Sequence, residues 1–234
     1  MTHQKRLSAP VSWPIERKTS TFTVGSGAGP HGEEGVPMVI VLRDILGYVD
    51  NEREAKYAVR SGYVTVNGNT VNDHQLPLGL FDILVFTERE EYYRIFPSQG
   101  GRLSLIPIDA EAAETKLSKV ADKQQVPGGQ TQLALHDGTT VIADDADAYG
   151  TGDSIILDLE SYEIVHHLPY EEGAMVTVVA GKHAGEIGTI DRIDVHAGSS
   201  PNTIVIDTED GTIETLEAYV VVIDENFTGG EEDG

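Results

Sequence analysis

Short runs of alternating hydrophobic and polar residues recur along most of the chain, and this spacing is typical of β-strands. The clearest runs lie at Tyr93–Phe96, Leu103–Ile106, Leu133–Ile142 and Asp153–Leu159. The third run turns at Asp137-Gly138, a dipeptide that favours a hairpin. Several more short strands, separated by glycine turns, are expected over residues 173–223, as in a small barrel. The pattern predicts an α+β protein that is mostly β and has several domains.

Two helices are predicted in the first half of the chain. Met38–Leu46 can form a short, heavily buried helix that ends at Gly47. Asn51 and Glu54 have the spacing of a capping box, in which the side chain of each residue accepts a hydrogen bond from the backbone N–H of the other. They predict the start of a second helix over Glu52–Ser61.

A hairpin and a third helix are expected further along. Tyr63–Val71 is predicted to be a hairpin because Asn67-Gly68 suits a two-residue turn. Asp109 is a good cap for a helix over Ala110–Val120. Three lysines lie towards or beyond its end: Lys116, Lys119 and Lys123. The helix dipole favours positive charge there, so these lysines require no ligand.

The two ends of the chain are expected to lack a core of their own. Residues 1–37 contain four prolines and the glycine-rich run 25–32, and they are predicted to be a pliable basic arm that orders on RNA. The glycine run is not expected to bind phosphate as a phosphate loop does, because it neither follows a strand nor opens a helix. Residues 224–234 are expected to be an acidic tail.

Charge is distributed unevenly along the chain. The net charge is −23, yet residues 1–32 hold four basic residues against one acidic residue, a balance of +3. The other 202 residues hold 12 basic and 38 acidic residues, a balance of −26. Abundant Val and Ile argue against disorder. Adaptation to molar salt, where self-repulsion is screened, is one explanation, and a basic partner is the other.

Several classes of chemistry are not expected. The chain has no cysteine, which excludes disulfides and thiolate metal sites. Its eight histidines lack metal-ligand spacing, and no strong catalytic motif occurs, so neither a metal, a cofactor nor enzymatic activity is expected. No apolar stretch approaches the roughly 18 residues of a membrane span, and the first residues lack the apolar core of a signal peptide. A cytoplasmic protein without a membrane or small-molecule partner is expected.

One motif resembles the S4 RNA-binding domain. It spans Asn51–Gly68, where a basic helix is followed by a glycine and a Val-Thr-Val-Asn-Gly hairpin. Lys56 and Arg60 are four residues apart on one helix face, and the hairpin turn presents backbone donors beside them, so two elements can hold phosphates. The family often has Ser-Arg where this chain has Asn51-Glu52. Arg53 is the candidate substitute for that arginine, and it is expected to point elsewhere.

A second motif, Val176–Ile190, resembles a KOW motif, the strand-loop-strand of a small SH3-like barrel. Gly181 and Gly185 enclose a tight loop with Lys182-His183 at its tip. These two residues are basic in an acidic region, and they are candidates for RNA or protein contact; glycines that only turn the barrel are the alternative.

The order of these motifs resembles the S4e family of small-subunit ribosomal proteins, of archaeal and eukaryotic type, here in a halophilic version. The resemblance covers nearly the whole chain, and shorter matches such as Lys5–Pro10 with Trp13, Gly79–Asp82 and Asp153–Ile155 add to it. It implies five parts: a basic extension (1–37), an S4-type domain (38–91), a central β-rich domain (92–170), a KOW barrel (171–223) and the tail.

The resemblance also implies partners. They are small-subunit (16S-type) ribosomal RNA and neighbouring small-subunit proteins, and the expected role is structural, in assembly and translation. The candidate RNA-binding residues are Lys5, Arg6, Trp13, Arg17, Lys18, His31, Arg43, Arg53, Lys56, Arg60, Asn67, Gly68, Lys182 and His183. Two alternatives stay open: a transcription-elongation accessory protein that uses its KOW barrel, and an RNA-modifying enzyme with an S4 domain.

Overall fold

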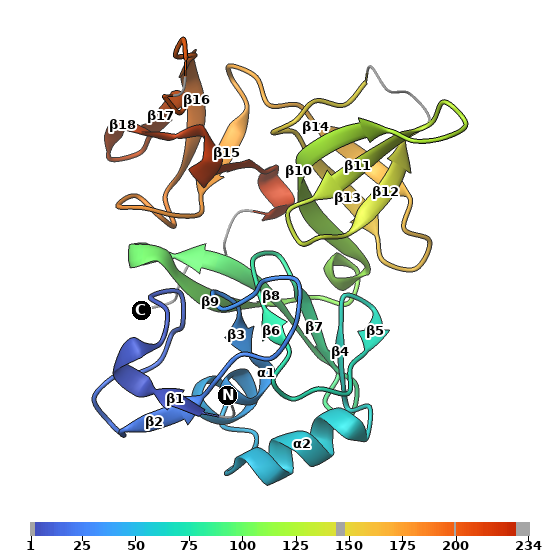
Figure 1. The fold of residues 1–234 in the computed structure, drawn as a ribbon, viewed down its shortest axis with the longest axis vertical. Helices are drawn as coiled ribbons and strands as arrows, with labels where there is room; N and C mark the ends of the chain where they lie inside the picture. The colour runs from blue at the N-terminus through green and yellow to red at the C-terminus, as the bar shows by residue number, and fades with distance from the viewer. Residues whose placement is uncertain (1–2, 144–147, 199, 228–234) are drawn as a thin grey trace. The chain divides into compact units, whose positions relative to one another are not determined.

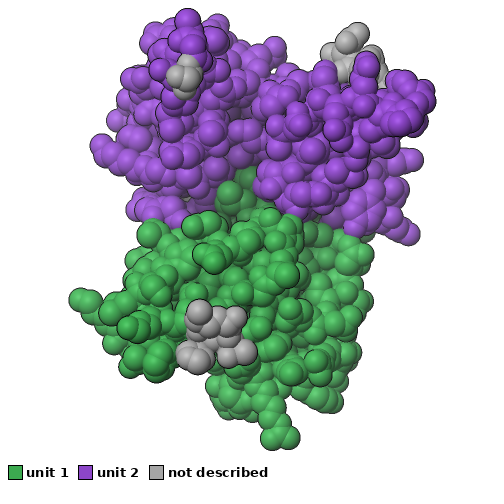
Figure 2. Space-filling view, in the orientation of Figure 1, with its two compact units in different colours: residues 1–96, 102–114 green, residues 97–101, 115–234 purple. Residues whose placement is uncertain are grey.

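The computed structural model describes residues 3–143, 148–198 and 200–227, and its chain forms two compact units. Unit 1 comprises residues 1–96 and 102–114, and unit 2 comprises residues 97–101 and 115–234; Figure 2 colours them separately. Both consist mainly of strands (Figure 1). The expected acidic tail is described to residue 227, and the rest of it lies outside the described residues.

Unit 1 is built on a five-stranded sheet. Its strand order is β5 (Asn69–Thr70), β4 (Val64–Val66), β7 (Ile83–Phe86), β8 (Glu91–Ser98) and β9 (Arg102–Ile108). The predicted hairpin is present as β4–β5, and its turn residues Asn67 and Gly68 have φ values of 49° and 75°. Positive φ at both positions defines the turn type that matches strand twist. Strands β8 and β9, which the sequence assigned to the central domain from residue 92, complete this sheet.

Both helices predicted in this unit are present. A short helix α1 (Met38–Ile40) continues as a π-helical segment, η2 (Val41–Ile45). The first five residues of the combined helix, 38–42, are buried. Helix α2 (Glu52–Arg60) begins at the predicted cap Asn51, and the Glu54 carboxylate reaches back to the backbone N–H of Asp50 and not to that of Asn51. The Asn51 side chain accepts a hydrogen bond from the backbone N–H of Glu54 at 3.1 Å and donates one to the Glu54 carboxylate at 2.7 Å.

The N-terminal segment is folded, and the prediction of a pliable arm is wrong. Strand β1 (His3–Lys5) pairs with β2 (Phe22–Val24), and β3 (Val36–Pro37) pairs with β6 (Pro77–Leu78). Trp13 is only 1% exposed and lies in the core that contains α1. Burial of this large ring and its apolar neighbours offsets the entropy of ordering the segment. Trp13 therefore has no surface with which to stack on RNA in this fold.

Unit 2 contains two five-stranded antiparallel sheets. The first has the order β12 (Thr140–Ala143), β11 (Thr131–Leu135), β10 (Thr115–Gln125), β13 (Ser154–Asp158) and β14 (Ile164–Leu168). The second has the order β18 (Gly211–Leu216), β17 (Thr203–Thr208), β16 (Ile187–Asp194), β15 (Met175–Val178) and β19 (Val220–Val222). Each sheet encloses its own hydrophobic cluster. The predicted hairpin at Asp137-Gly138 is present as β11–β12.

The helix predicted over Ala110–Val120 is absent. Asp109 does cap a turn, since its carboxylate accepts from the Ala112 backbone N–H at 2.7 Å, but the turn η4 (Ala112–Glu114) is short. The chain then enters β10, which pairs with β11 on one side and β13 on the other. Two ladders of backbone hydrogen bonds outweigh the local helical preference. The other short 3-10 turns are η1 (Arg6–Ser8), η3 (Gln99–Gly101), η5 (Glu217–Tyr219) and η6 (Glu225–Phe227).

The three lysines of β10 have partners within the chain and not the helix dipole that the sequence suggested, and this is compatible with the prediction that they require no ligand. Lys116 and Lys119 are the least exposed of the three. Lys116 is buried, and its ammonium lies 2.6 Å from the Asp137 carboxylate. The Lys119 ammonium donates to the backbone carbonyls of Val220 at 2.6 Å and Glu217 at 3.3 Å. Burial lowers the pKa of Lys119, partly offset by the Glu217 carboxylate. Both lysines therefore hold unit 2 together.

Candidate nucleic-acid interface

The basic residues are concentrated in unit 1. This unit holds 11 basic and 15 acidic residues, a net charge of −4, whereas unit 2 holds 5 basic and 24 acidic residues, a net charge of −19. The two units carry nearly the same number of residues, so the contrast is one of composition and not of size. If either unit contacts a polyanion, unit 1 meets the lower electrostatic barrier.

The basic side chains divide into two groups by their contacts. Of the 16, nine make a hydrogen bond or ion pair within the chain: Arg6, Arg17, Arg43, Arg89, Arg94, Lys116, Lys119, Lys123 and Arg192. Within the described ranges, the other seven make neither: Lys5, Lys18, Arg53, Lys56, Arg60, Arg102 and Lys182. Six of these seven lie in unit 1. These seven cations are therefore the ones whose donors an external anion could use without breaking a contact of the fold.

Helix α2 arranges three of the unpaired cations in one stripe. Ala55 and Val59 are fully buried and fix which side of the helix faces the core. At 100° per residue, Arg53, Lys56 and Arg60 fall outside that buried side and within about a sixth of a turn of one another, with Lys56 nearest to the buried side. All three are exposed. Arg53 lies about 100° around the helix from Glu52, so it points elsewhere than an arginine at position 52 would. It extends the predicted pair of Lys56 and Arg60 to a stripe of three.

The side chain of Asn67 fixes the hairpin turn that follows α2 in the chain. The Asn67 amide donates to the Asp82 carboxylate at 2.8 Å and accepts from the Ile83 backbone N–H at 2.9 Å. Its side chain is therefore committed to the fold and does not face outward. Gly68 is exposed, so the backbone of the turn is the part of this motif that a ligand can reach.

The same carboxylate ties the N-terminal segment to this turn. The His31 ring lies 3.0 Å from Asp82, with 10% and 3% of the two side chains exposed. Gly79 makes the approach possible, because a Cβ there would lie 2.1 Å from the His31 ring. The Gly79 backbone N–H also donates to Asp82 at 2.9 Å. His31 is therefore a buried support of the surface in this structure.

Three more predicted cations are also engaged within the fold. Arg6 is 7% exposed and donates to the Glu16 carbonyl. Arg17 donates to the carbonyls of Ala9 at 2.7 Å and Pro10 at 2.6 Å. Arg43 is partly buried and pairs with its neighbour Asp44 at 2.7 Å. These arginines shape the N-terminal segment and helix η2.

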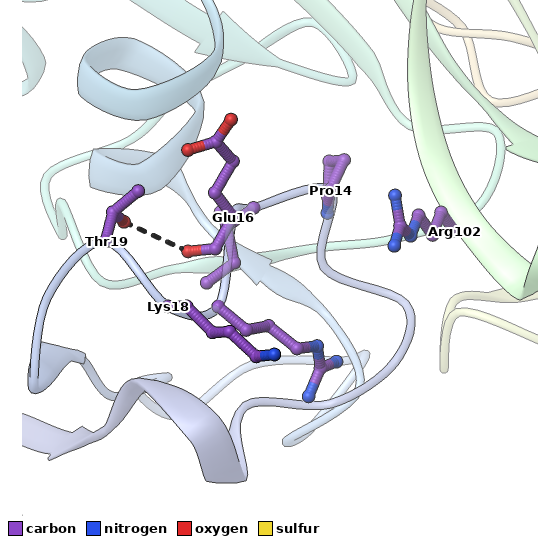
Figure 3. Close-up of a pocket in the computed structure, with 7 residues that line it drawn as sticks. Pro14, Glu16, Lys18, Thr19 and Arg102 are labelled. Atoms are coloured by element: carbon purple, nitrogen blue, oxygen red, sulfur yellow. Dashed lines mark hydrogen bonds between the residues drawn. The ribbon is translucent and has the colours of Figure 1, made fainter.

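Sequence reasoning missed Arg102. It lies at the start of β9 and lines a hollow of about 500 Å³ formed mostly by the N-terminal segment. Figure 3 shows Arg102 on one side of this hollow and Lys18 on another. The hollow is lined by Pro14, Ile15, Glu16, Arg17, Lys18, Thr19 and Arg102. No motif surrounds Arg102 in the sequence, and only the fold brings it to Lys18.

The KOW loop presents a single unpaired cation. Lys182 is exposed, whereas the His183 ring lies 2.9 Å from the Glu186 carboxylate. Gly181 and Gly185 have φ values of 84° and 92°, which strain any other residue. At Gly185 a Cβ would also lie 2.8 Å from the Ser98 backbone. The backbone of the loop thus requires glycine at both positions, whatever Lys182 contacts.

In the described part of the chain, no group of three or more His, Asp or Glu side chains is placed so that it could hold a metal ion. None of the helices in the same ranges has the length and apolar character that a membrane crossing requires.

Three family models match successive parts of the chain. They are the RS4NT (NUC023) domain over residues 2–34, ribosomal family S4e over residues 89–164, and the KOW motif over residues 172–207. The last match contains the predicted segment Val176–Ile190. These matches define the class as that of a ribosomal protein of the S4e type.

Similar proteins narrow the class further. The chain is 60% identical to small ribosomal subunit protein eS4 of Natronomonas pharaonis over 99% of this chain and 98% of that one. It is 57% identical to eS4 of Haloarcula marismortui and 41% identical to eS4 of Archaeoglobus fulgidus. The crystal structure of 30S ribosomal protein S4e from Thermoplasma acidophilum superposes with a TM-score of 0.69 at 31% identity, over 81% of this chain and 94% of that one. The chain belongs to the eS4 family of small ribosomal subunit proteins.

Proposed function

We propose that the chain is a structural constituent of the small ribosomal subunit in the cytoplasm, where it binds ribosomal RNA and supports subunit assembly and translation. The names of its relatives support the role, and they are those of a ribosomal structural family and not of an enzyme class. The observation that carries the proposal is the set of six unpaired cations in unit 1, within a chain of net charge −23.

The predicted RNA-binding residues take two roles in this proposal. The exposed ones meet the RNA: Lys5, Lys18, Arg53, Lys56, Arg60, Gly68 and Lys182, together with Arg102. The engaged ones hold that surface in shape: Arg6, Trp13, Arg17, His31, Arg43, Asn67 and His183. Recognition by the first group is mainly of phosphates, which position the protein without reading the sequence.

The salt concentration limits how much these cations contribute to the affinity for RNA. Release of counterions rewards phosphate contacts at low salt, and this reward falls steeply as salt rises. In molar salt, where the Debye length is about 3 Å, shape, hydrogen bonds and stacking must supply more of the affinity. The acidic side chains of unit 2 then keep the protein hydrated and soluble. Neighbouring small-subunit proteins are the second class of partner in this proposal.

Charge removal on α2 tests the proposal. We expect Lys56→Ala/Arg60→Ala to weaken binding to purified small-subunit ribosomal RNA at every KCl concentration. Because each phosphate contact contributes about 0.7–0.9 to the slope of log affinity against log salt, the slope should become shallower by about 1.4–1.8. Filter binding across a KCl series measures both quantities.

A matched variant removes two paired cations instead. Lys123→Ala/Arg192→Ala deletes the same charge from unit 2, where Lys123 donates to the Tyr149 carbonyl and Arg192 pairs with Asp194. Its affinity and slope should stay close to those of the unmodified chain. Equal effects of the two double variants would show that only net charge matters and would contradict the assignment of α2.

A further inference from the structure

A second hollow lies beside helix α2, and no predicted contact except Arg53 lines it. Its volume is about 610 Å³, and it is formed by α2 and the loop that precedes it. The residues that line it are Tyr48, Val49, Asn51, Arg53, Glu54, Tyr57 and Ala58. Much of this lining is apolar or aromatic. The hollow therefore suits a flat, largely apolar ligand with an anionic attachment near Arg53.

The polar groups of this lining are occupied within the fold. The Glu54 carboxylate accepts from the Asp50 backbone N–H at 2.9 Å and from the Asn51 amide. The Tyr48 hydroxyl bonds to the Glu91 carboxylate and lies 3.0 Å from the Tyr93 hydroxyl. Among the described residues, the guanidinium of Arg53 makes no such bond. The one cation in this lining is thus also a charged group without a partner in the described part of the chain.

Tyr57 supplies an exposed aromatic surface beside this cation. The residue is 67% exposed, although it belongs to a helix that buries Ala55 and Val59. Its ring packs edge-to-face on Tyr63 of the following segment, with centroids 6.4 Å apart and planes at 75°. That contact positions the ring from one side and leaves most of it open to solvent. Helical geometry places Tyr57 next to Arg53 and Arg60 in the cationic stripe.

We propose that this hollow receives one unpaired base of RNA, stacked on the Tyr57 ring, with the backbone phosphate beside Arg53. The inference rests on the proposed function, and it names a contact that would maintain the affinity for RNA in molar salt. Stacking on an aromatic side chain tolerates any base and does not depend on counterion release, in contrast to phosphate contacts. Single-stranded loops and bulges, where bases are not stacked in a helix, present such a base.

Substitutions at Tyr57 separate stacking from charge. Tyr57→Ala should weaken binding to small-subunit ribosomal RNA by about ten- to hundredfold, the range that corresponds to the loss of one base–aromatic stack. Tyr57→Phe keeps the ring and should stay within about twofold of the unmodified chain. The slope of log affinity against log KCl should not change in either variant, because no cation is removed. Since Tyr57 is exposed, unchanged thermal unfolding confirms that both variants fold.

A fluorescence measurement locates the base independently of affinity. The chain has one tryptophan, Trp13, which is buried, so Tyr57→Trp introduces one exposed indole. RNA binding should quench this indole, while the indole of the control variant Val165→Trp should keep its emission, because Val165 is 49% exposed on β14 and does not line the hollow. If RNA binds the unmodified chain but Tyr57→Ala binds equally well and Tyr57→Trp is not quenched, the stacking site is excluded and the proposed function stands. If RNA does not bind the unmodified chain in any salt, the proposed function itself fails.

Discussion

At the residue scale, the contacts of each cation separate structure from recognition. Lys116 and Lys56 are the same residue type, yet the first is buried against Asp137 and the second is exposed and unpaired. A buried ammonium must be paired, because its desolvation costs several kcal/mol. An exposed lysine needs no partner for stability, so its position on a cationic stripe carries information about ligands. The sequence does not distinguish the two cases.

Removal of one member of the buried pair provides a test at this scale. We expect Lys116→Met to lower the free energy of unfolding by about 3–5 kcal/mol, because it leaves the Asp137 carboxylate buried without a counter-charge. The double variant Lys116→Met/Asp137→Leu should recover most of that loss. Chemical unfolding in molar KCl at neutral pH measures both, and equal instability of the single and double variants would contradict the pairing.

The same pair sets the sign of the pH dependence. Burial raises the pKa of Asp137, but the Lys116 ammonium and the Thr139 backbone N–H outweigh it and leave the pKa below its ordinary value. A carboxyl group whose pKa is lowered by folding stabilises the fold above its unfolded pKa and loses this contribution as the pH falls through the folded value. The contribution of this pair should therefore persist down to the ordinary carboxyl range and be lost below it, so acid titration of the fold should show Lys116→Met unfolding at a higher pH than the unmodified chain.

At the element scale, the sequence predicted correctly those helices and turns that depend on residues close together in the chain. The Asn51–Glu54 cap and the Asn67-Gly68 turn each lie within a few residues, and both α2 and the β4–β5 hairpin are present as predicted. The helix expected over Ala110–Val120 failed because the partners of β10 come from β11 and β13, up to about forty residues away. The fold of the N-terminal segment was not predicted for a similar reason, because the core that buries Trp13 is formed by residues that come later in the chain.

The candidate surface was predictable to a similar degree. Six of the seven unpaired cations were chosen from the sequence, since motifs or the basic N-terminal composition marked them. Arg102 was missed because it stands outside every motif. Tyr57 was missed because a tyrosine between Lys56 and Ala58 has no distinctive spacing, and its exposure appears only once the buried side of α2 is known.

The cap at Asn51 provides a test of how α2 presents its charges. We expect Asn51→Ala to lower the free energy of unfolding by about 0.5–2 kcal/mol, because the Glu54 backbone N–H loses its acceptor. RNA binding should weaken as the first turn, which carries Arg53, loses order. Asn72→Ala is the control, since Asn72 is exposed and its side chain makes no hydrogen bond within the described residues. A similar effect of both substitutions on unfolding in urea would contradict the role of the cap.

At the scale of the whole molecule, charge is divided between the two units more sharply than the net value suggests. Unit 1 is close to neutral at −4, and unit 2 carries −19. The two most similar relatives named above, at 60% and 57% identity, come from halophilic archaea, which favours adaptation to molar salt as the cause of the acidic composition. Eleven of the 16 basic residues lie in unit 1, which is the distribution that the proposed contact with phosphates requires.

Sedimentation of a cell extract in molar KCl tests the central claim most directly. The account predicts that the chain is found in the small-subunit fraction in a one-to-one ratio with other small-subunit proteins, and that Lys56→Ala/Arg60→Ala reduces this occupancy relative to Lys123→Ala/Arg192→Ala. Recovery of the chain free in the supernatant, or with RNA polymerase, would contradict the ribosomal role and favour a transcription accessory that acts through its KOW barrel.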